Sequence, residues 1–228
     1  MFAAYPNFTD VCGRYLLGRG TYPTSIKVRT PLGHADIRVD SFHDLLTVNE
    51  IFARKDYHAP RDIDVVVDIG SNIGISAIYF LTRNRDSRVF LFEPLPRNID
   101  ALKANLRGYE ARYVLREVAV GTNNGMVEFG WEDTGRYGGV GRAGKRRLDV
   151  PCRDINDVLA EILREVGRID VLKIDVEGSE EDLLRHASRE HLRRIRRIYA
   201  ECDGRRIELP GFRHRQYGPI ARFFRLQA

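Results

Sequence analysis

Short apolar runs that end in an acidic residue recur along this chain. Between Asp64 and Asp68 the chain is apolar and β-branched, with Asp68 as the acid at its end, and Arg88 to Pro94 and Ile169 to Gly178 also carry an apolar run that is followed by acidic residues. Runs of this length and composition are typical of buried parallel strands. Between them, apolar residues at helical spacing predict helices near residues 73–83, 96–106 and 153–166. Strands that alternate with helices indicate an α/β fold with a parallel sheet.

The remaining patterns complete one such sheet. They predict a hairpin over 25–30 and 35–40, a helix over 42–52, a strand near 111–120, an extra antiparallel strand over 126–131, a fifth strand over 195–201 and a closing hairpin over 212–217 and 220–226. We therefore expect a Rossmann-like fold with a mostly parallel seven-stranded sheet, a C-terminal antiparallel hairpin and a small N-terminal extension. Residues 1–60 form that extension and residues 61–228 the ligand-binding part of the same domain.

Length and composition limit the class of protein. A chain of 228 residues holds one sizeable core. It contains no run of eighteen apolar residues, and its N-terminus lacks the charged start and apolar stretch of a signal peptide. The three cysteines, Cys12, Cys152 and Cys202, have no metal-binding spacing and suit a reducing interior. We expect a cytoplasmic protein without a membrane span.

The net charge of +5 is carried almost wholly by arginine, because lysine occurs only at positions 27, 55, 103, 145 and 173. Arginine binds carboxylate and phosphate as a planar fork, so the charge is compatible with an anionic substrate. An arginine-for-lysine bias across the whole surface is also what a GC-rich genome produces. We attribute the overall arginine bias to genome composition and keep anion binding as an interpretation for local arginine clusters.

The three acid-ended strands predict a ligand site, because the carboxyl ends of parallel strands meet at one edge of a sheet. The turn after the first strand carries Gly70, Asn72 and Gly74. A dinucleotide fingerprint requires glycines where Asn72 and Ile75 stand, so NAD is disfavoured. Asp68 before this turn suits the cationic end of S-adenosylmethionine (SAM), and Glu93 suits ribose hydroxyls.

A family resemblance follows from motifs in this order: Val-Val-Val-Asp-Ile-Gly-Ser-Asn-Ile-Gly at 65–74, Phe-Glu-Pro at 92–94, Val-Ala-Val-Gly at 118–121 and Leu-Lys-Ile-Asp-Val-Glu-Gly-Ser-Glu at 172–180. Together they resemble the FkbM-type SAM-dependent methyltransferases over about residues 26–203. The resemblance implies O-methylation of a hydroxyl on a sugar, polyketide or other secondary metabolite. The expected cofactor-binding residues are Asp68, Gly70, Ser71, Asn72, Gly74, Glu93, Pro94, Ala119, Val120 and Asp175.

Methyl transfer to a hydroxyl needs a group that removes the proton, and a positioned base contributes ~10²–10⁴-fold. The strand ends supply four candidates, Asp175, Glu177, Glu201 and Asp203. Asp175 is our first choice, with Glu177 expected on the same face of the strand or as a cap of the next helix. The family's fifth strand commonly ends in Glu-x-His. Here Asp203 replaces that histidine, which leaves the identity of the base open.

Two further segments have alternative readings. Residues 134–147 are rich in glycine and basic residues, and this composition predicts a mobile loop that is either a lid or a solvated connector. The pattern Ser179-x-x-Asp182 predicts a capping box that starts a helix. Only a short Pro/Gly-rich segment, residues 204–211, stands where the family usually has a helix, so a homodimer is one way to cover the exposed sheet face.

Several functions remain open. A small-molecule O-methyltransferase is the first, and it is favoured. An RNA methyltransferase is compatible with the charge, but no aromatic platform for RNA is visible. A metal-dependent O-methyltransferase would use the four acids to hold Mg²⁺, and we rank it below metal-free base catalysis. A SAM-binding module without chemistry is disfavoured by the retained acids.

Overall fold

The computed structural model describes residues 4–131, 138–140, 146–202 and 207–226. Its helices are α1 (Phe8–Leu17), α2 (Phe42–Val48), α3 (Ile75–Leu81), α4 (Pro96–Asn105), α5 (Ile155–Val166), α6 (Glu180–His186) and α7 (Arg189–Leu192), with a π-helix η1 (Asn49–Arg54) and a 3-10 helix η2 (Glu110–Arg112). The strands are β1 (Thr24–Thr30), β2 (Gly33–Val39), β3 (Val65–Ile69), β4 (Arg88–Phe92), β5 (Tyr113–Arg116), β6 (Ala119–Gly121), β7 (Gly125–Trp131), β8 (Gly138–Val140), β9 (Arg146–Asp154), β10 (Ile169–Ile174), β11 (Ile195–Glu201), β12 (Phe212–Tyr217) and β13 (Ile220–Arg225).

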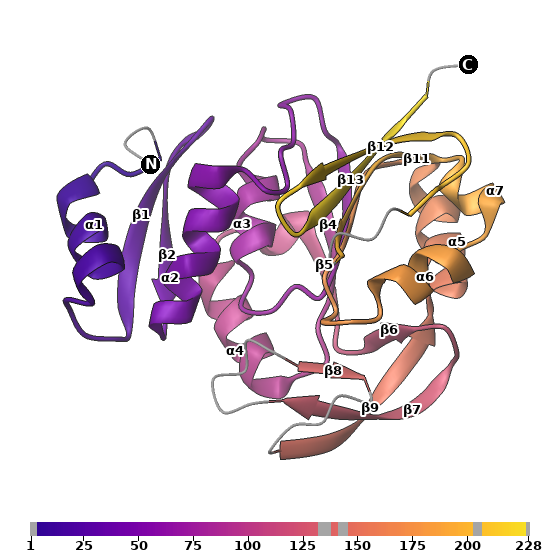
Figure 1. Ribbon diagram of the computed structural model, residues 1–228, viewed down its shortest axis with the longest axis horizontal. Helices are drawn as coiled ribbons and strands as arrows, with labels where there is room; N and C mark the ends of the chain where they lie inside the picture. Colours follow the sequence, from indigo (N-terminus) through magenta and orange to yellow (C-terminus); the bar gives the residue numbers. More distant parts are fainter. Residues whose placement is uncertain (1–3, 132–137, 141–145, 203–206, 227–228) are drawn as a thin grey trace.

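A seven-stranded sheet forms the centre of the molecule (Figure 1), in the order β12-β13-β11-β10-β3-β4-β5. The pairs from β11 to β5 are parallel, and β13 runs antiparallel to both of its neighbours. β13 is inserted between β11 and β12, so the closing hairpin extends the sheet at one edge. The prediction of a Rossmann-like, mostly parallel seven-stranded sheet is confirmed.

Each face of this sheet buries its own core. Val66 of β3 and Val171 of β10 pack on the side of α3 and α4, whereas Val67 and Leu172 pack with α5 and α6 on the other side. Successive residues of a strand point to opposite faces, so strands that are covered on both sides must be apolar throughout. This requirement explains the unbroken apolar runs in the sequence.

Helix α5 shows how local sequence fixes an element. The Asp154 side chain accepts a hydrogen bond from the Asn156 N–H at 2.7 Å and caps the N-terminus. Val158 and Leu159 face the core, and Gly167 ends the helix with φ of +80°. The helix therefore begins two residues later than the 153–166 pattern predicted.

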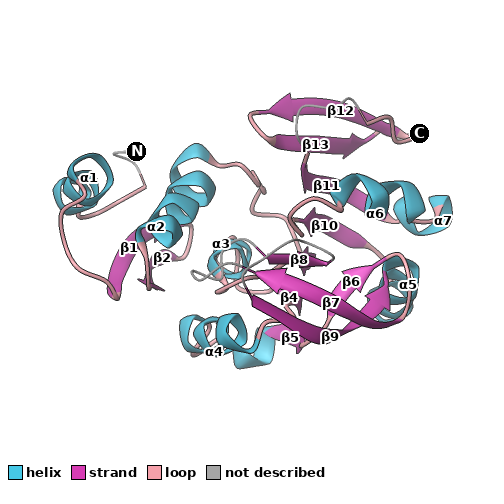
Figure 2. Ribbon diagram, turned by 60° about the horizontal axis from the view of Figure 1, so that its bottom comes forward, coloured by secondary structure: helices cyan, strands magenta, loops and turns pink. Residues whose placement is uncertain are grey.

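A second, four-stranded sheet has the order β6-β9-β7-β8 and lies beside the central sheet (Figure 2). The sequence predicted one strand near 111–120, but the chain divides it into β5 in the central sheet and β6 in the second. The prediction of a loop throughout 134–147 is wrong for Gly138–Val140 and for Arg146 and Arg147, which pair with β7. Residues 134–137 and 141–145, the rest of the predicted lid or connector, lie outside the described residues.

The N-terminal extension packs against α3 and α4. Ile26, Ile37 and Leu45 belong to the same buried cluster as Leu102 of α4. The Asn105 side chain also holds β2, because its Oδ1 accepts from the Arg38 N–H at 2.8 Å and its Nδ2 donates to the Arg38 carbonyl at 3.2 Å. The boundary at residues 60/61 stays a prediction. Among the residues that the structure describes, no helix combines the length and apolar character that a membrane crossing requires.

Candidate active site

A cavity of about 350 Å³ opens at the carboxyl ends of β3, β4, β10 and β11. The predicted site residues that line it are Gly70, Ser71, Asn72, Glu93, Pro94, Ala119, Val120, Asp175, Glu177 and Glu201. Thr47 of α2 and Glu50, Ile51 and Arg54 of the π-helix η1 close another side. π-helical turns are frequent at functional sites. The extension therefore forms a wall of the cavity, a role that the sequence did not reveal.

The turn after β3 forms the first part of the site. Gly70 has φ of +80°, and a Cβ built on it would lie 1.8 Å from the carbonyl oxygen of Asp175. Only glycine allows this approach of the two backbones. Asn72 also has a positive φ, of 47°, and its Oδ1 accepts from the Ile73 N–H at 2.8 Å. Gly74 does not line the cavity; it lies against Leu102, whose Cγ would be 3.2 Å from an added Cβ.

Asp68 lies behind this turn. It is fully buried and does not line the cavity. Its Oδ1 lies 2.9 Å from Lys173 Nζ, and its Oδ2 accepts from the Ser76 hydroxyl at 2.6 Å. Both of its oxygens contact protein groups in this structure, and the expected contact of Asp68 with the cationic end of the cofactor stays a prediction. These contacts hold Lys173 and the start of α3.

Glu93 directly follows β4 and lines the cavity there. Its Oε2 accepts from the Asn72 N–H at 2.8 Å, and its Oε1 accepts from the Leu95 N–H at 3.0 Å and from Asn98 Nδ2 at 3.2 Å. Burial raises the pKa of Glu93 to about 7, although these N–H donors act in the opposite direction. Glu93 thus ties the glycine turn to the start of α4 at the cavity edge. The sequence found Glu93 but not its partner Asn98.

Three of the four predicted catalytic carboxylates converge on the cavity. Asp175, Glu177 and Glu201 line it, and Asp203 lies outside the described residues. Glu201 and Asp175 share a hydrogen bond. Burial, followed by the negative charges of Asp175 and Glu177, raises the pKa of Glu201 to about 8. Although Glu201 is an exposed residue at the end of β11, this environment favours its protonated form, which is able to donate a hydrogen bond.

The arrangement of Asp175 and Glu177 differs from the expected one. β10 ends at Ile174, and Glu177 has φ of +62°, so the two acids do not alternate along a strand. Glu177 instead sits in a tight turn on which β8 packs: a Cβ on Gly139 would lie 3.0 Å from the Val176 carbonyl oxygen. The described part of the glycine-rich segment is thus placed next to the carboxylates.

The start of α6 is also capped differently. Ser179 makes no capping hydrogen bond with its side chain. Glu180 accepts from the N–H groups of Val176 and Gly178, each at 2.9 Å, and closes the turn that carries Glu177. The predicted capping box is wrong, because the Ser179 side chain accepts no hydrogen bond from the start of α6.

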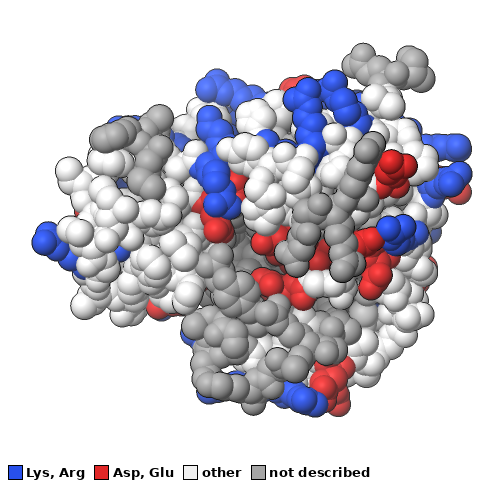
Figure 3. Space-filling model, in the orientation of Figure 1, with Lys and Arg blue, Asp and Glu red and all other residues white. Residues whose placement is uncertain are grey.

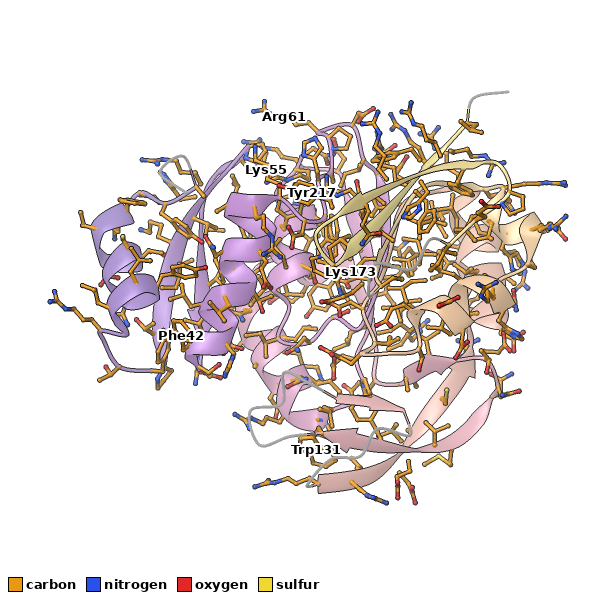
Figure 4. The ribbon with its side chains drawn as sticks, viewed as in Figure 1. Phe42, Lys55, Arg61, Trp131, Lys173 and Tyr217 are labelled. Carbon is orange, nitrogen blue, oxygen red and sulfur yellow. The ribbon has the colours of Figure 1, made fainter. Side chains whose placement is uncertain are left out.

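Two site residues were missing from the predicted set. Lys173 is buried near the middle of the molecule (Figure 4), where its Nζ lies 3.4 Å from Asp175 Oδ2. Tyr57, which follows η1, donates its hydroxyl to the same oxygen at 3.0 Å. The sequence carried a signal for both, since Lys173 stands inside the motif at 172–180 and Tyr57 follows the helix predicted over 42–52. None of the six histidines lines the cavity.

Acidic groups dominate the cavity. The charged residues that line it are Asp44, Glu50, Asp56, Glu93, Asp175, Glu177, Asp182, Glu201, Arg54 and Lys173. Both cations are bound to carboxylates, Arg54 to Asp56 and Lys173 to Asp68. Aspartate and glutamate side chains gather around the hollow at the centre of the molecule (Figure 3). Within the described ranges, no three His, Cys, Asp or Glu side chains converge as ligands for a metal ion.

Comparison with known proteins identifies related chains. Residues 68–224 match the model of the methyltransferase FkbM domain. The chain is 29% identical over 168 residues to the 2-O-methyltransferase NoeI of Sinorhizobium fredii, covering 63% of this chain and 65% of that protein. It is 26% identical over 168 residues to methyltransferase sdnD of Sordaria araneosa, covering 60% of this chain and 65% of that protein. The chain thus spans less than two-thirds of the length of both relatives.

A solved methyltransferase from Geobacter sulfurreducens has 16% sequence identity and a TM-score of 0.45, with 79% of each chain covered. The family match runs from Asp68, near the end of β3, to the last strand, β13, and so includes both the glycine turn and the carboxylates. On the extent of this match, the chain belongs to the FkbM methyltransferase family.

Proposed function

We propose that this enzyme binds SAM in the cavity and methylates a hydroxyl group of a small molecule. One observation carries the proposal: the glycine turn with Glu93 and the hydrogen-bonded pair Asp175 and Glu201 line the same cavity. The first group suits a nucleoside and the second suits proton removal. Both stand at the edge of the sheet where α/β proteins bind ligands.

The residues of the cavity fit SAM. Its volume of about 350 Å³ is that of a small-molecule site. Glu93 offers a carboxylate to the ribose hydroxyls of SAM. Pro94, Ala119 and Val120 supply an apolar wall for its adenine ring. The carboxylates across the cavity favour a ligand with a sulfonium and an ammonium group. When bound, SAM would supply an electrophilic methyl group.

The chain's own task is to position the acceptor hydroxyl and take its proton. Asp175 is the proposed base, since Tyr57 and Lys173 both contact one of its oxygens. Glu201, protonated at neutral pH, is suited to donate a hydrogen bond at the same place. A base held in this way contributes ~10²–10⁴-fold to the rate.

The acceptor is proposed to be neutral or cationic. The many carboxylates of the cavity would repel an anion, and both cations that line it are already paired. An anionic acceptor, which the arginine content suggested, is therefore less favoured. The relative NoeI is named a 2-O-methyltransferase, which supports a hydroxyl as the methylated group here. Thr47 and Glu50 would face such an acceptor from the wall that the extension forms.

The test begins with the cofactor. Calorimetry with SAM, S-adenosylhomocysteine (SAH) and NAD should give SAM and SAH much tighter binding than NAD. Methyl transfer from isotopically labelled SAM is then followed with nucleotide sugars, aminoglycosides and macrolides, and the modified atom is found by NMR. NAD that binds tighter than SAM would overturn the cofactor assignment. A methyl group found on nitrogen, carbon or RNA would overturn the acceptor assignment.

A further inference from the structure

One oxygen of Asp175 is held by two buried donors from distant parts of the chain. Tyr57 donates its hydroxyl to Asp175 Oδ2 at 3.0 Å, and Lys173 Nζ lies 3.4 Å from the same atom. Tyr57 and Lys173 are both almost fully buried, whereas a quarter of the Asp175 side chain is exposed. One side of this carboxylate is thus fixed inside the protein while the residue still lines the cavity.

Lys173 has no freedom to act elsewhere. Besides Asp175, its ammonium contacts Asp68 Oδ1 at 2.9 Å and donates to the Gly70 carbonyl at 2.9 Å. An ammonium has three N–H donors, so these contacts use all of them. Burial alone would lower the pKa of Lys173, but the charges of Asp68 and Asp175 raise it above its usual value. Lys173 is therefore a fixed cation.

Tyr57 is fixed in the same way. Its ring lies 5.4 Å from Lys173 Nζ and 6.1 Å from the ring of Tyr199. Burial, followed by the charges of Asp175 and Glu201, raises the pKa of Tyr57 well above its usual value. Its phenol therefore keeps its proton and serves only as a donor.

We propose that Lys173 and Tyr57 are positioning residues that keep Asp175 ionised, so that the proton of the carboxyl cluster resides on Glu201. Donors that contact the charged form of an acid favour that form. The charged groups that raise the pKa of Glu201 to about 8 are the carboxylates Asp175, Glu177 and Glu50. This inference rests on the proposed function, because it describes how the base of that reaction is kept ready to accept a proton.

Among the described residues, the charged or titratable groups that interact most strongly with the pair come from three parts of the fold. From β10 and the turn after it come Lys173, Glu177 and Glu180; from β3, Asp68; from η1 and the loop after it, Glu50 and Tyr57. Lys173 is the cation in this set, and it contacts Asp175. The asymmetry between Asp175 and Glu201 follows from that placement.

A purely structural role is the rival explanation, because Lys173 also joins β3, the glycine turn and β10. The two explanations differ in what removal of a single hydroxyl does. Tyr57→Phe keeps the ring and removes only the donor to Asp175. Tyr199→Phe is the matched control, since Tyr199 is an equally buried neighbour whose hydroxyl donates to the His58 carbonyl instead.

The experiment records the ¹³C chemical shifts of the Asp and Glu carboxyl carbons between pH 5 and 10, with cooperative thermal unfolding as the check of folding and SAH affinity as a separate measurement. In the wild type at pH 7 we expect Asp175 as a carboxylate and Glu201 as a carboxylic acid. Tyr57→Phe should raise the ratio of protonated to ionised Asp175 about tenfold, as expected for one hydrogen bond to a charged group. Tyr199→Phe should leave both resonances unchanged.

The paired variant Asp68→Asn/Lys173→Met removes the buried cation together with a buried anion, and it should shift the proton toward Asp175 further than Tyr57→Phe does. If this variant does not fold, Tyr57→Phe decides alone. Unchanged titration of Asp175 in Tyr57→Phe, or a wild-type protein in which Asp175 rather than Glu201 is protonated at pH 7, overturns the proposal. Carboxyl titration does not need SAM, so a protein that fails to bind SAH refutes the proposed function without affecting this result.

Discussion

Gly70 and Asp175 meet backbone to backbone at the floor of the cavity, where a Cβ on Gly70 would lie 1.8 Å from the Asp175 carbonyl oxygen. The turn after β3 and the end of β10 are therefore placed by the same contact. The Asp175 N–H also donates to the Ile69 carbonyl at 3.0 Å, so a backbone hydrogen bond joins the same two segments. The cofactor half and the carboxylate half of the site are rigidly connected as a result.

Gly70→Ala should abolish or greatly weaken SAH binding. Alanine is strained at φ of +80°, and its Cβ would force the turn away from the Asp175 backbone, which cannot move without breaking β10. Gly108→Ala is the matched control, because Gly108 has φ of +91° and nothing within 4 Å of an added Cβ. The control should cost about 1 kcal/mol, or ~2–4 °C in Tm, and leave SAH affinity intact. Equal effects of both variants in calorimetry and thermal unfolding would refute the contact.

Glu93→Ala should lower SAH affinity by about 10–100-fold, since hydrogen bonds to a carboxylate contribute ~1.5–3 kcal/mol each. It should also lower Tm, because the donors of Asn72, Leu95 and Asn98 lose their acceptor. Asn98→Ala separates the two effects: it removes one donor to Glu93 but keeps the carboxylate. Calorimetry of the pair should find a small loss of affinity for Asn98→Ala and a large one for Glu93→Ala. An unchanged affinity in Glu93→Ala would remove Glu93 from the binding site.

The strands and the carboxylates at their ends were predictable because both depend on local pattern. An apolar run that ends in an acid indicates a buried strand and its exposed end, and a parallel sheet brings those ends together. Asp175, Glu201 and Glu93 were found for this reason. The glycine turn was found because its positions need a positive φ or a close backbone approach.

Lys173 and Tyr57 were not predicted as site residues because their roles depend on packing between distant segments. A lysine inside a strand gives no sign that its ammonium is buried between Asp68 and Asp175. Tyr57 reaches Asp175 only because the N-terminal extension folds over the edge of the sheet. The second sheet was missed for a similar reason: β6 and β9 pair over residues 119–121 and 152–154, which share no local pattern.

Glu201→Gln should stabilise the protein at alkaline pH. The carboxyl pKa is about 8 in the folded state and 4.5 ordinarily, so the folded state holds a proton that the unfolded chain releases between these values. Its contribution to stability is therefore present at low pH and falls as pH rises through that window. Glutamine mimics the protonated acid and does not titrate. Solvent around the exposed Glu201 weakens this effect. The difference in Tm between Glu201→Gln and wild type should therefore be near zero at pH 5, and the variant should melt about 2–4 °C higher at pH 9, as expected for about 1 kcal/mol.

The exposed Glu190 at the start of α7 supplies the control for that experiment. Glu190→Gln should show the same small Tm difference from wild type at pH 5 and at pH 9. If the difference for Glu201→Gln is likewise independent of pH, Glu201 is ionised in the folded state at neutral pH. The assignment of the proton to Glu201 would then be wrong.

The identity of the base can be tested with isosteric variants. Asp175→Asn keeps the shape of the side chain and removes its charge, so SAH binding should survive while kcat falls by ~10²-fold or more on any acceptor that the wild type methylates. Asp203→Asn, at the position where the family commonly has histidine, should cost much less if Asp203 only orients the acceptor. Measuring both with and without EDTA tests the metal alternative, since a required divalent ion would make the wild type sensitive to the chelator. Full activity in both variants would exclude these two carboxylates as the base, and a fall in Asp203→Asn alone would transfer the role to Asp203.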